Sequence, residues 1–131
     1  MLEFEPEDET PFPHKKITEA IIGSGFEVYK HLGYGFLHRV YQRSLQVELT
    51  RRGLSGDLEK RTTVRYKDVV VGEYDGDLVV NDVVLVEIKI APQYDKRDQA
   101  QLLNVLKATG LKVGILLNFG RYKVEFKRLI F

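Results

Sequence analysis

The 131-residue chain contains no cysteine and no tryptophan, and it has one methionine. Without cysteine there is no disulfide framework, no thiolate metal site and no cysteine nucleophile. No apolar run approaches the length of a membrane span, and the N-terminus lacks the basic-then-apolar pattern of a secretion signal. We therefore expect a cytoplasmic protein with no membrane partner.

Two common catalytic motifs are also absent. Gly23-Ser24-Gly25 lies inside a helical pattern, so it does not predict a Walker or Rossmann phosphate loop. No Gly-x-Ser-x-Gly sequence occurs, which leaves a serine-hydrolase elbow without support.

Charge is distributed unevenly along the chain. The formal net charge is +1, but residues 1–13 hold five acids and no base, which leaves 20 bases against 14 acids in residues 14–131, a balance of +6. A mildly basic body behind an acidic tail is compatible with a phosphate-backbone ligand. On charge alone, an ordinary solvated surface with a charged tail is the favoured interpretation.

Apolar periodicity predicts one α/β (α+β) domain over residues 14–131, with residues 1–13 as a flexible acidic tail. Gly33, Gly53 and Gly110 are expected to end the helices, and Asp95 to cap the third. We expect a central mixed sheet flanked by helices. The predicted helices span residues 14–32, 37–52 and 95–109, and the predicted strands span residues 62–66, 69–73, 78–80, 83–90, 111–118 and 122–131.

Glu87 and Lys89 form the first candidate site. Residues two apart in a strand share a face, and this pair ends the apolar run 83–86. Burying charge is costly unless the charge is paired or binds a metal, so the pair is either an ion pair or a metal ligand beside a lysine that positions water. Glu125 and Lys127 repeat this spacing on a strand that is predicted to be exposed to solvent. The spacing alone therefore does not distinguish an ion pair from a metal site.

Asp77 lies ten residues before Glu87, across a predicted hairpin at Asn81-Asp82. Two carboxylates on one face would suit Mg²⁺ or Mn²⁺. A two-residue loop would place Asp77 and Glu87 on opposite faces, whereas a three-residue loop or a bulge would pair them directly. The catalytic hypothesis predicts the second register, and the competing interpretation makes Asp77 a simple turn residue.

His38 lies in the first turn of the second predicted helix, and Gln101 lies on the third. An imidazole binds Mn²⁺ and other transition metals, although a lone histidine is more often a surface or capping residue. Gln101 reaches the same region only if its helix packs over that part of the sheet. Otherwise it is an ordinary polar helix residue.

Several of these segments together resemble the GxxExxY proteins of the PD-(D/E)XK nuclease superfamily. The resemblance runs in order through residues 32–41, 66–67, 72–73, 77–80, 86–89, 101–104, 106–111 and 117–120, which is far more specific than any one motif. It implies a PD-(D/E)XK nuclease-like fold and a metal-dependent phosphodiesterase core.

The resemblance also implies roles for single residues. Asp77 and Glu87 would hold Mg²⁺ or Mn²⁺ with help from the Ile88 carbonyl, and Lys89 would orient or activate the attacking water. Gln101 would contact the substrate or support the metal ligands. Tyr41, the tyrosine of the signature segment, would have the same role.

The chain departs from the family pattern at two positions. His38 stands where the family has its signature glutamate, and Val105 stands where a tyrosine is usual. His38 either ligates the metal in place of the glutamate or marks a damaged site.

We therefore expect a metal-dependent nuclease with ligands His38, Asp77, Glu87 and Ile88, acting on nucleic acid and on DNA ahead of RNA. The alternative is an inactive module of the same fold that binds nucleic acid or a partner protein. A homo-oligomer is compatible with either function.

Overall fold

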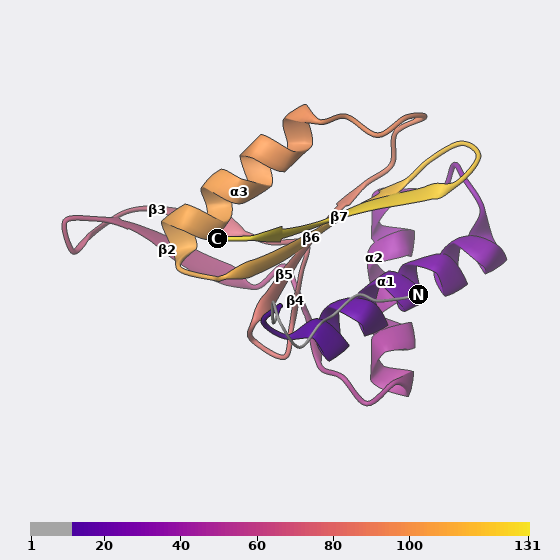
Figure 1. Ribbon diagram of the computed structural model, residues 1–131, viewed down its shortest axis with the longest axis horizontal. Helices are drawn as coiled ribbons and strands as arrows, with labels where there is room; N and C mark the ends of the chain where they lie inside the picture. The colour runs from indigo at the N-terminus through magenta and orange to yellow at the C-terminus, as the bar shows by residue number, and fades with distance from the viewer. Residues whose placement is uncertain (1–11) are drawn as a thin grey trace.

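The computed structural model describes residues 12–131, and most of the predicted tail lies outside this range (Figure 1). The order of elements agrees with the prediction, apart from one short additional strand, β1. In chain order the elements are α1 (Lys15–Leu32), α2 (His38–Arg51), β1 (Gly56–Leu58), β2 (Arg61–Tyr66), β3 (Val69–Asp75), β4 (Leu78–Val80), β5 (Val84–Lys89), α3 (Arg97–Thr109), β6 (Val113–Phe119) and β7 (Val124–Ile130).

Five of the strands form one mixed sheet in the order β1-β4-β5-β6-β7. Strands β5 and β6 are parallel, and all other neighbours in this sheet are antiparallel. A parallel pair needs a crossover, which α3 supplies between β5 and β6. Helices α1 and α2 cover one face of the sheet and α3 covers the other (Figure 1). The predicted central mixed sheet flanked by helices is confirmed.

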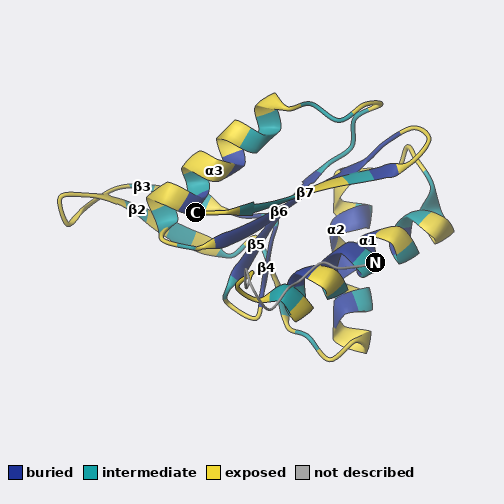
Figure 2. Ribbon diagram, in the orientation of Figure 1, coloured by how far each residue is buried: buried dark blue, intermediate teal, exposed yellow. Residues whose placement is uncertain are grey.

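Each face of the sheet contributes to a separate apolar cluster, and the central strands are buried on both faces (Figure 2). In β5, Val84, Val86 and Ile88 pack with α1 and α2, whereas Leu85 packs with α3. Side chains alternate along a strand, so Glu87 and Lys89 share the α3 side with Leu85. The continuous apolar run in β5 is therefore explained by helices on both sides.

The β2–β3 hairpin is a separate two-stranded sheet, which corrects the prediction of a single sheet. Its residues are largely exposed, including Tyr66, Val69 and Val71, and the hairpin projects beyond the body of the molecule (Figure 1). Local strand propensity is satisfied by pairing within the hairpin. Which further strand lies beside it depends on tertiary packing, which periodicity does not report.

The helix ends follow the predicted signals closely. Gly33 and Gly110 end α1 and α3 with positive φ angles of 70° and 83°. Helix α3 begins at Arg97, two residues after Asp95, and the Asp95 carboxylate accepts a hydrogen bond from the Arg97 N–H at 2.9 Å. None of the three helices within residues 12–131 has the length and apolar character that a membrane span requires.

Gly76 lets the chain pass close to the core directly before Asp77. A Cβ atom at Gly76 would lie 2.3 Å from Leu85 Cδ1, and Leu85 is 1% exposed, so the core would have to shift. We expect Gly76→Ala to lower the free energy of unfolding by about 1–3 kcal/mol in urea titrations.

Gly72→Ala is the matched control, because a Cβ at Gly72 meets no atom within 4 Å and Gly72 lies in the preceding strand, β3. Equal losses in the two variants would show that close packing at Gly76 is not the cause.

Candidate metal and phosphodiester site

The register of β4 and β5 places two carboxylates together at the end of the sheet. Leu78 pairs with Val86 and Val80 pairs with Val84, so three residues form the connecting loop. Asp77 therefore lies beside Glu87, and its N–H donates a hydrogen bond to Glu87 Oε1 at 3.2 Å. This is the register that the catalytic hypothesis predicts.

His38 reaches this strand end from the opposite layer, as the first residue of α2. Its Nε2 lies 3.3 Å from Asp77 Oδ2 and 3.2 Å from the Ile88 carbonyl oxygen. A hydrogen bond from this nitrogen to the Ile88 carbonyl requires the tautomer that carries its proton on Nε2. Asp77 Oδ2 also accepts a hydrogen bond from the Ile88 N–H at 2.8 Å. The Asp77 carboxylate thus joins α2 to the end of β5.

A pocket of about 540 Å³ opens over these groups. The pocket lining contains most of the site residues predicted from the sequence, which lie on α2, β5 and α3. It also contains residues at the end of strand β3, in the β2–β3 hairpin. Its lining includes His38, Asp77, Glu87, Ile88, Lys89 and Gln101, together with Tyr74 and Asp75.

The environment of Glu87 disfavours its charge. Burial raises the pKa of Glu87, and the Asp77 N–H and the charges of Lys89 and His38 only partly offset that effect. A cation in the pocket would favour the ionised form. Carboxylates with a pKa shifted in this way cluster at functional sites.

The donor set fits a divalent cation. Adjacent ligands of an octahedral Mg²⁺ at about 2.1 Å lie about 3.0 Å apart, close to the spacing of His38 Nε2 from Asp77 Oδ2 and from the Ile88 oxygen. Within residues 12–131, no three His, Asp or Glu side chains converge tightly enough to hold an ion by themselves. An ion at this place would therefore need a further donor, and the Ile88 carbonyl oxygen lies 3.2 Å from His38 Nε2.

The structure places Tyr41 in the core and not on the pocket wall. It is fully buried and stacks on Phe119 with ring centroids 4.5 Å apart. Its hydroxyl donates to the Gly33 carbonyl and accepts from the Phe36 N–H. Tyr41 thus has no direct access to substrate, and it fixes the loop that leads into His38.

Two buried amides near the site were not identified from the sequence. Gln42 donates to the Asp77 carbonyl at 2.7 Å, and Asn118 exchanges two hydrogen bonds with the Ala91 backbone just after β5. Gln42 lies one turn after His38 on the buried face of α2, so helical periodicity could have found it. Asn118 lies within an apolar run, where a buried polar residue is the available signal.

Glu87→Gln is expected to stabilise the fold at neutral pH. A carboxyl whose pKa rises on folding makes the folded state less stable as pH climbs from about 4.5 through the raised value. Glutamine keeps the acceptor for the Asp77 N–H and removes the charge. The Tm at pH 7 should therefore rise by a few degrees in a thermal scan, and the gain should shrink toward pH 4.5.

Glu125→Gln, in the equivalent spacing on the edge strand β7, is the control and should change Tm less. A lower Tm for Glu87→Gln at pH 7 would contradict burial as the dominant effect.

Comparison with known proteins supports the fold and the superfamily. The crystal structure of SSO0001 matches with a TM-score of 0.52 and 16% identity, over 95% of this chain and 58% of that one. At that identity the match shows the fold alone, and this chain spans little more than half of that structure's chain. No curated protein matches. The resemblance to the GxxExxY proteins stays a prediction. A family model described as PD-(D/E)XK nuclease superfamily matches residues 15–129, and the chain therefore belongs to the PD-(D/E)XK nuclease superfamily.

Proposed function

We propose that the protein is a metal-dependent nuclease that hydrolyses phosphodiester bonds in nucleic acid, with DNA ahead of RNA as substrate. The observation that carries this proposal is the convergence of Asp77, Glu87, Lys89 and His38 on one pocket at the end of β5. Membership of the superfamily supports the reaction class. The arrangement of side chains in the pocket supports the choice of these four residues.

Mg²⁺ or Mn²⁺ would be held by Asp77, Glu87, the Ile88 carbonyl and His38. When bound, such an ion polarises the phosphate and stabilises the charge that develops in the transition state. His38 would ligate through Nε2 as the neutral tautomer that carries its proton on Nδ1. Imidazole ligation favours Mn²⁺ over Mg²⁺, because oxygen ligands suit Mg²⁺ best.

Lys89 supports the chemistry from the same face of β5 as Glu87. It lines the pocket, and its charge acts on the Glu87 carboxyl. In the proposed mechanism the Lys89 ammonium orients the attacking water or stabilises the negative charge on the phosphate. Gln101, on α3, lines the same pocket, where it would contact the substrate or support the metal ligands.

An inactive module is the second candidate, and His38 is the observation that favours it. His38 replaces the family glutamate and already forms a contact with Asp77 and the Ile88 carbonyl. Because these polar groups already bond one another, a bound metal would add less binding free energy. In that case the pocket would bind nucleic acid or a partner protein without cleaving it.

Cleavage assays on single- and double-stranded DNA and RNA test the catalytic proposal. Cleavage should require Mn²⁺ or Mg²⁺ and stop in EDTA. Asp77→Asn, Glu87→Gln and Lys89→Met should each lower the rate by about 10²-fold or more, because each removes charge aimed at the reacting phosphate. Lys127→Met, in the same Glu-x-Lys spacing on β7, should cleave like the wild type. Equal activity in all variants would refute the assignment.

Calorimetric titration of Mn²⁺ tests the ligands without requiring turnover. Asp77→Asn and His38→Ala should each weaken binding at least about tenfold, as loss of a ligand does. His31→Ala is the control, since His31 also pairs with a carboxylate, Glu27, but away from this pocket. Binding lost only in Asp77→Asn would remove His38 from the ligand set, and no binding by the wild type would favour the inactive module.

A further inference from the structure

Helix α2 carries a row of arginines on its exposed side that begins next to the site. Arg39, Arg43, Val47 and Arg51 follow one another at intervals of four residues, so neighbouring members lie about one turn apart and the row winds by about 120° around the helix from Arg39 to Arg51. All four side chains are exposed. Because Arg39 directly follows His38, the row starts at the edge of the candidate site and runs along α2 away from it.

The charges of this row are uncompensated within the part of the chain that the structure describes. Arg39, Arg43 and Arg51 have no hydrogen bond or ion pair with any residue between 12 and 131. The neighbouring Arg52 bonds Glu48, the only acid of α2. Outside α2, some cations are paired, as Arg97 is with Asp95, whereas others, such as Lys123 and Lys127, have no ion pair among residues 12–131.

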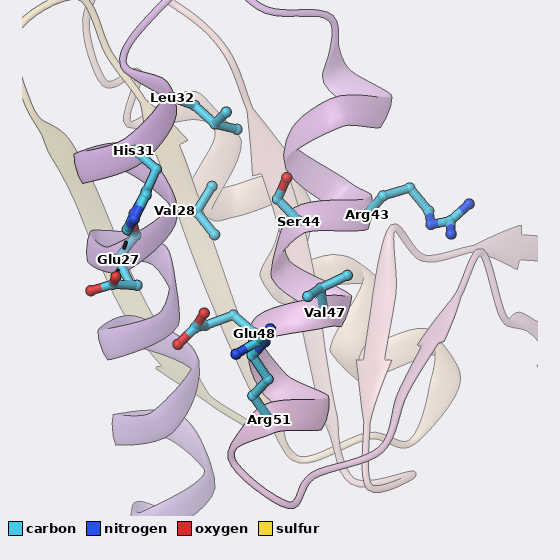
Figure 3. Close-up of a pocket in the computed structure, with 9 residues that line it drawn as sticks. All are labelled: Glu27, Val28, His31, Leu32, Arg43, Ser44, Val47, Glu48 and Arg51. Carbon is cyan, nitrogen blue, oxygen red and sulfur yellow. Dashed lines mark hydrogen bonds and ion pairs between the residues drawn. The ribbon is translucent and has the colours of Figure 1, made fainter.

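The groove between α1 and α2 adds surface beside the row (Figure 3). A pocket of about 500 Å³ lies there, lined by both helices, with Arg43 and Arg51 among its residues. The two acids of this pocket are each paired, Glu27 with His31 at 3.4 Å and Glu48 with Arg52 at 3.3 Å. Figure 3 shows Arg43 extending from α2 away from α1. With His31 counted as neutral, three arginines (Arg43, Arg51 and Arg52) against two acids (Glu27 and Glu48) leave a balance of +1 on this side of α2.

We propose that the arginine row binds the phosphate backbone of one nucleic-acid strand and guides it along α2 to the site. The choice of ligand rests on the proposed function. Guanidinium groups bind phosphate oxygens in a bidentate manner, and an exposed row without acidic partners complements a polyanion. Twelve residues of helix span about 18 Å, which equals the rise of about five nucleotides of a strand.

Binding is measured by fluorescence anisotropy with labelled duplex DNA, single-stranded DNA and single-stranded RNA in EDTA, over a KCl series. The triple variant Arg39→Gln, Arg43→Gln, Arg51→Gln is compared with a control triple variant that changes net charge equally. The control, Lys60→Gln, Arg61→Gln, Arg97→Gln, alters cations that the structure pairs with carboxylates.

The α2 variant is expected to bind 10–100-fold more weakly at about 100 mM KCl, with a slope of log K against log salt that is shallower by about two to three. The control should stay within about threefold of the wild type. A third variant with lysine at all three α2 positions keeps the charge and should retain most of the slope. Circular dichroism verifies that each variant is folded.

The outcomes separate this inference from the proposed function. If the wild type binds nucleic acid but the two glutamine variants lose equal affinity, overall charge is responsible and the arginine row is refuted. If the wild type binds none of the three nucleic acids in low salt, the row and the proposed nucleic-acid substrate fail together. If the α2 variant alone loses binding, the row is supported even where no cleavage is seen, since the assay contains no metal.

Discussion

The register of β4 against β5 is the constraint on which the rest of the site depends. The loop of three residues pairs Leu78 with Val86 and so brings Asp77 beside Glu87. Because side chains alternate along a strand, a shift of one residue would send Asp77 to the opposite face. The same shift would move Leu78 and Val80 out of the cluster under α1 and α2. Core packing and site geometry therefore favour the same register.

Polar contacts connect the paired strands β4 and β5 to helix α2. Gln42 holds the Asp77 carbonyl, and His38 contacts both the Asp77 carboxylate and the Ile88 carbonyl. Gln42 is 2% exposed, so loss of its partner would leave a buried amide unsatisfied. Tyr41 fixes the loop before α2 from within the core. The helix start is thus positioned by several directional bonds, which is what a site needs to hold donor atoms within a fraction of an ångström.

The environment of Glu87 lowers the stability of the fold at the candidate site. Burial raises the pKa of Glu87, so the folded state resists the charge that a metal would need. The apolar strands around it supply the stability that offsets this cost, since β6 is buried along its whole length. Glu125, in the same spacing on the edge strand β7, instead accepts a hydrogen bond from the Tyr94 N–H at 3.1 Å, so the same tripeptide pattern has different partners in the two strands.

Sequence by itself determined the elements, the central position of β5 and the set of residues worth examining. Apolar periodicity and glycine signals depend on local geometry, so they placed the helices and strands closely, although they missed the three-residue β1. They could not decide which strands pair beyond a hairpin, so the isolation of β2–β3 was not foreseen. The choice between two registers for Asp77, the burial of Tyr41 and the reach of His38 to Ile88 were decided only in the tertiary structure, because each depends on contacts between segments 10 to 78 residues apart.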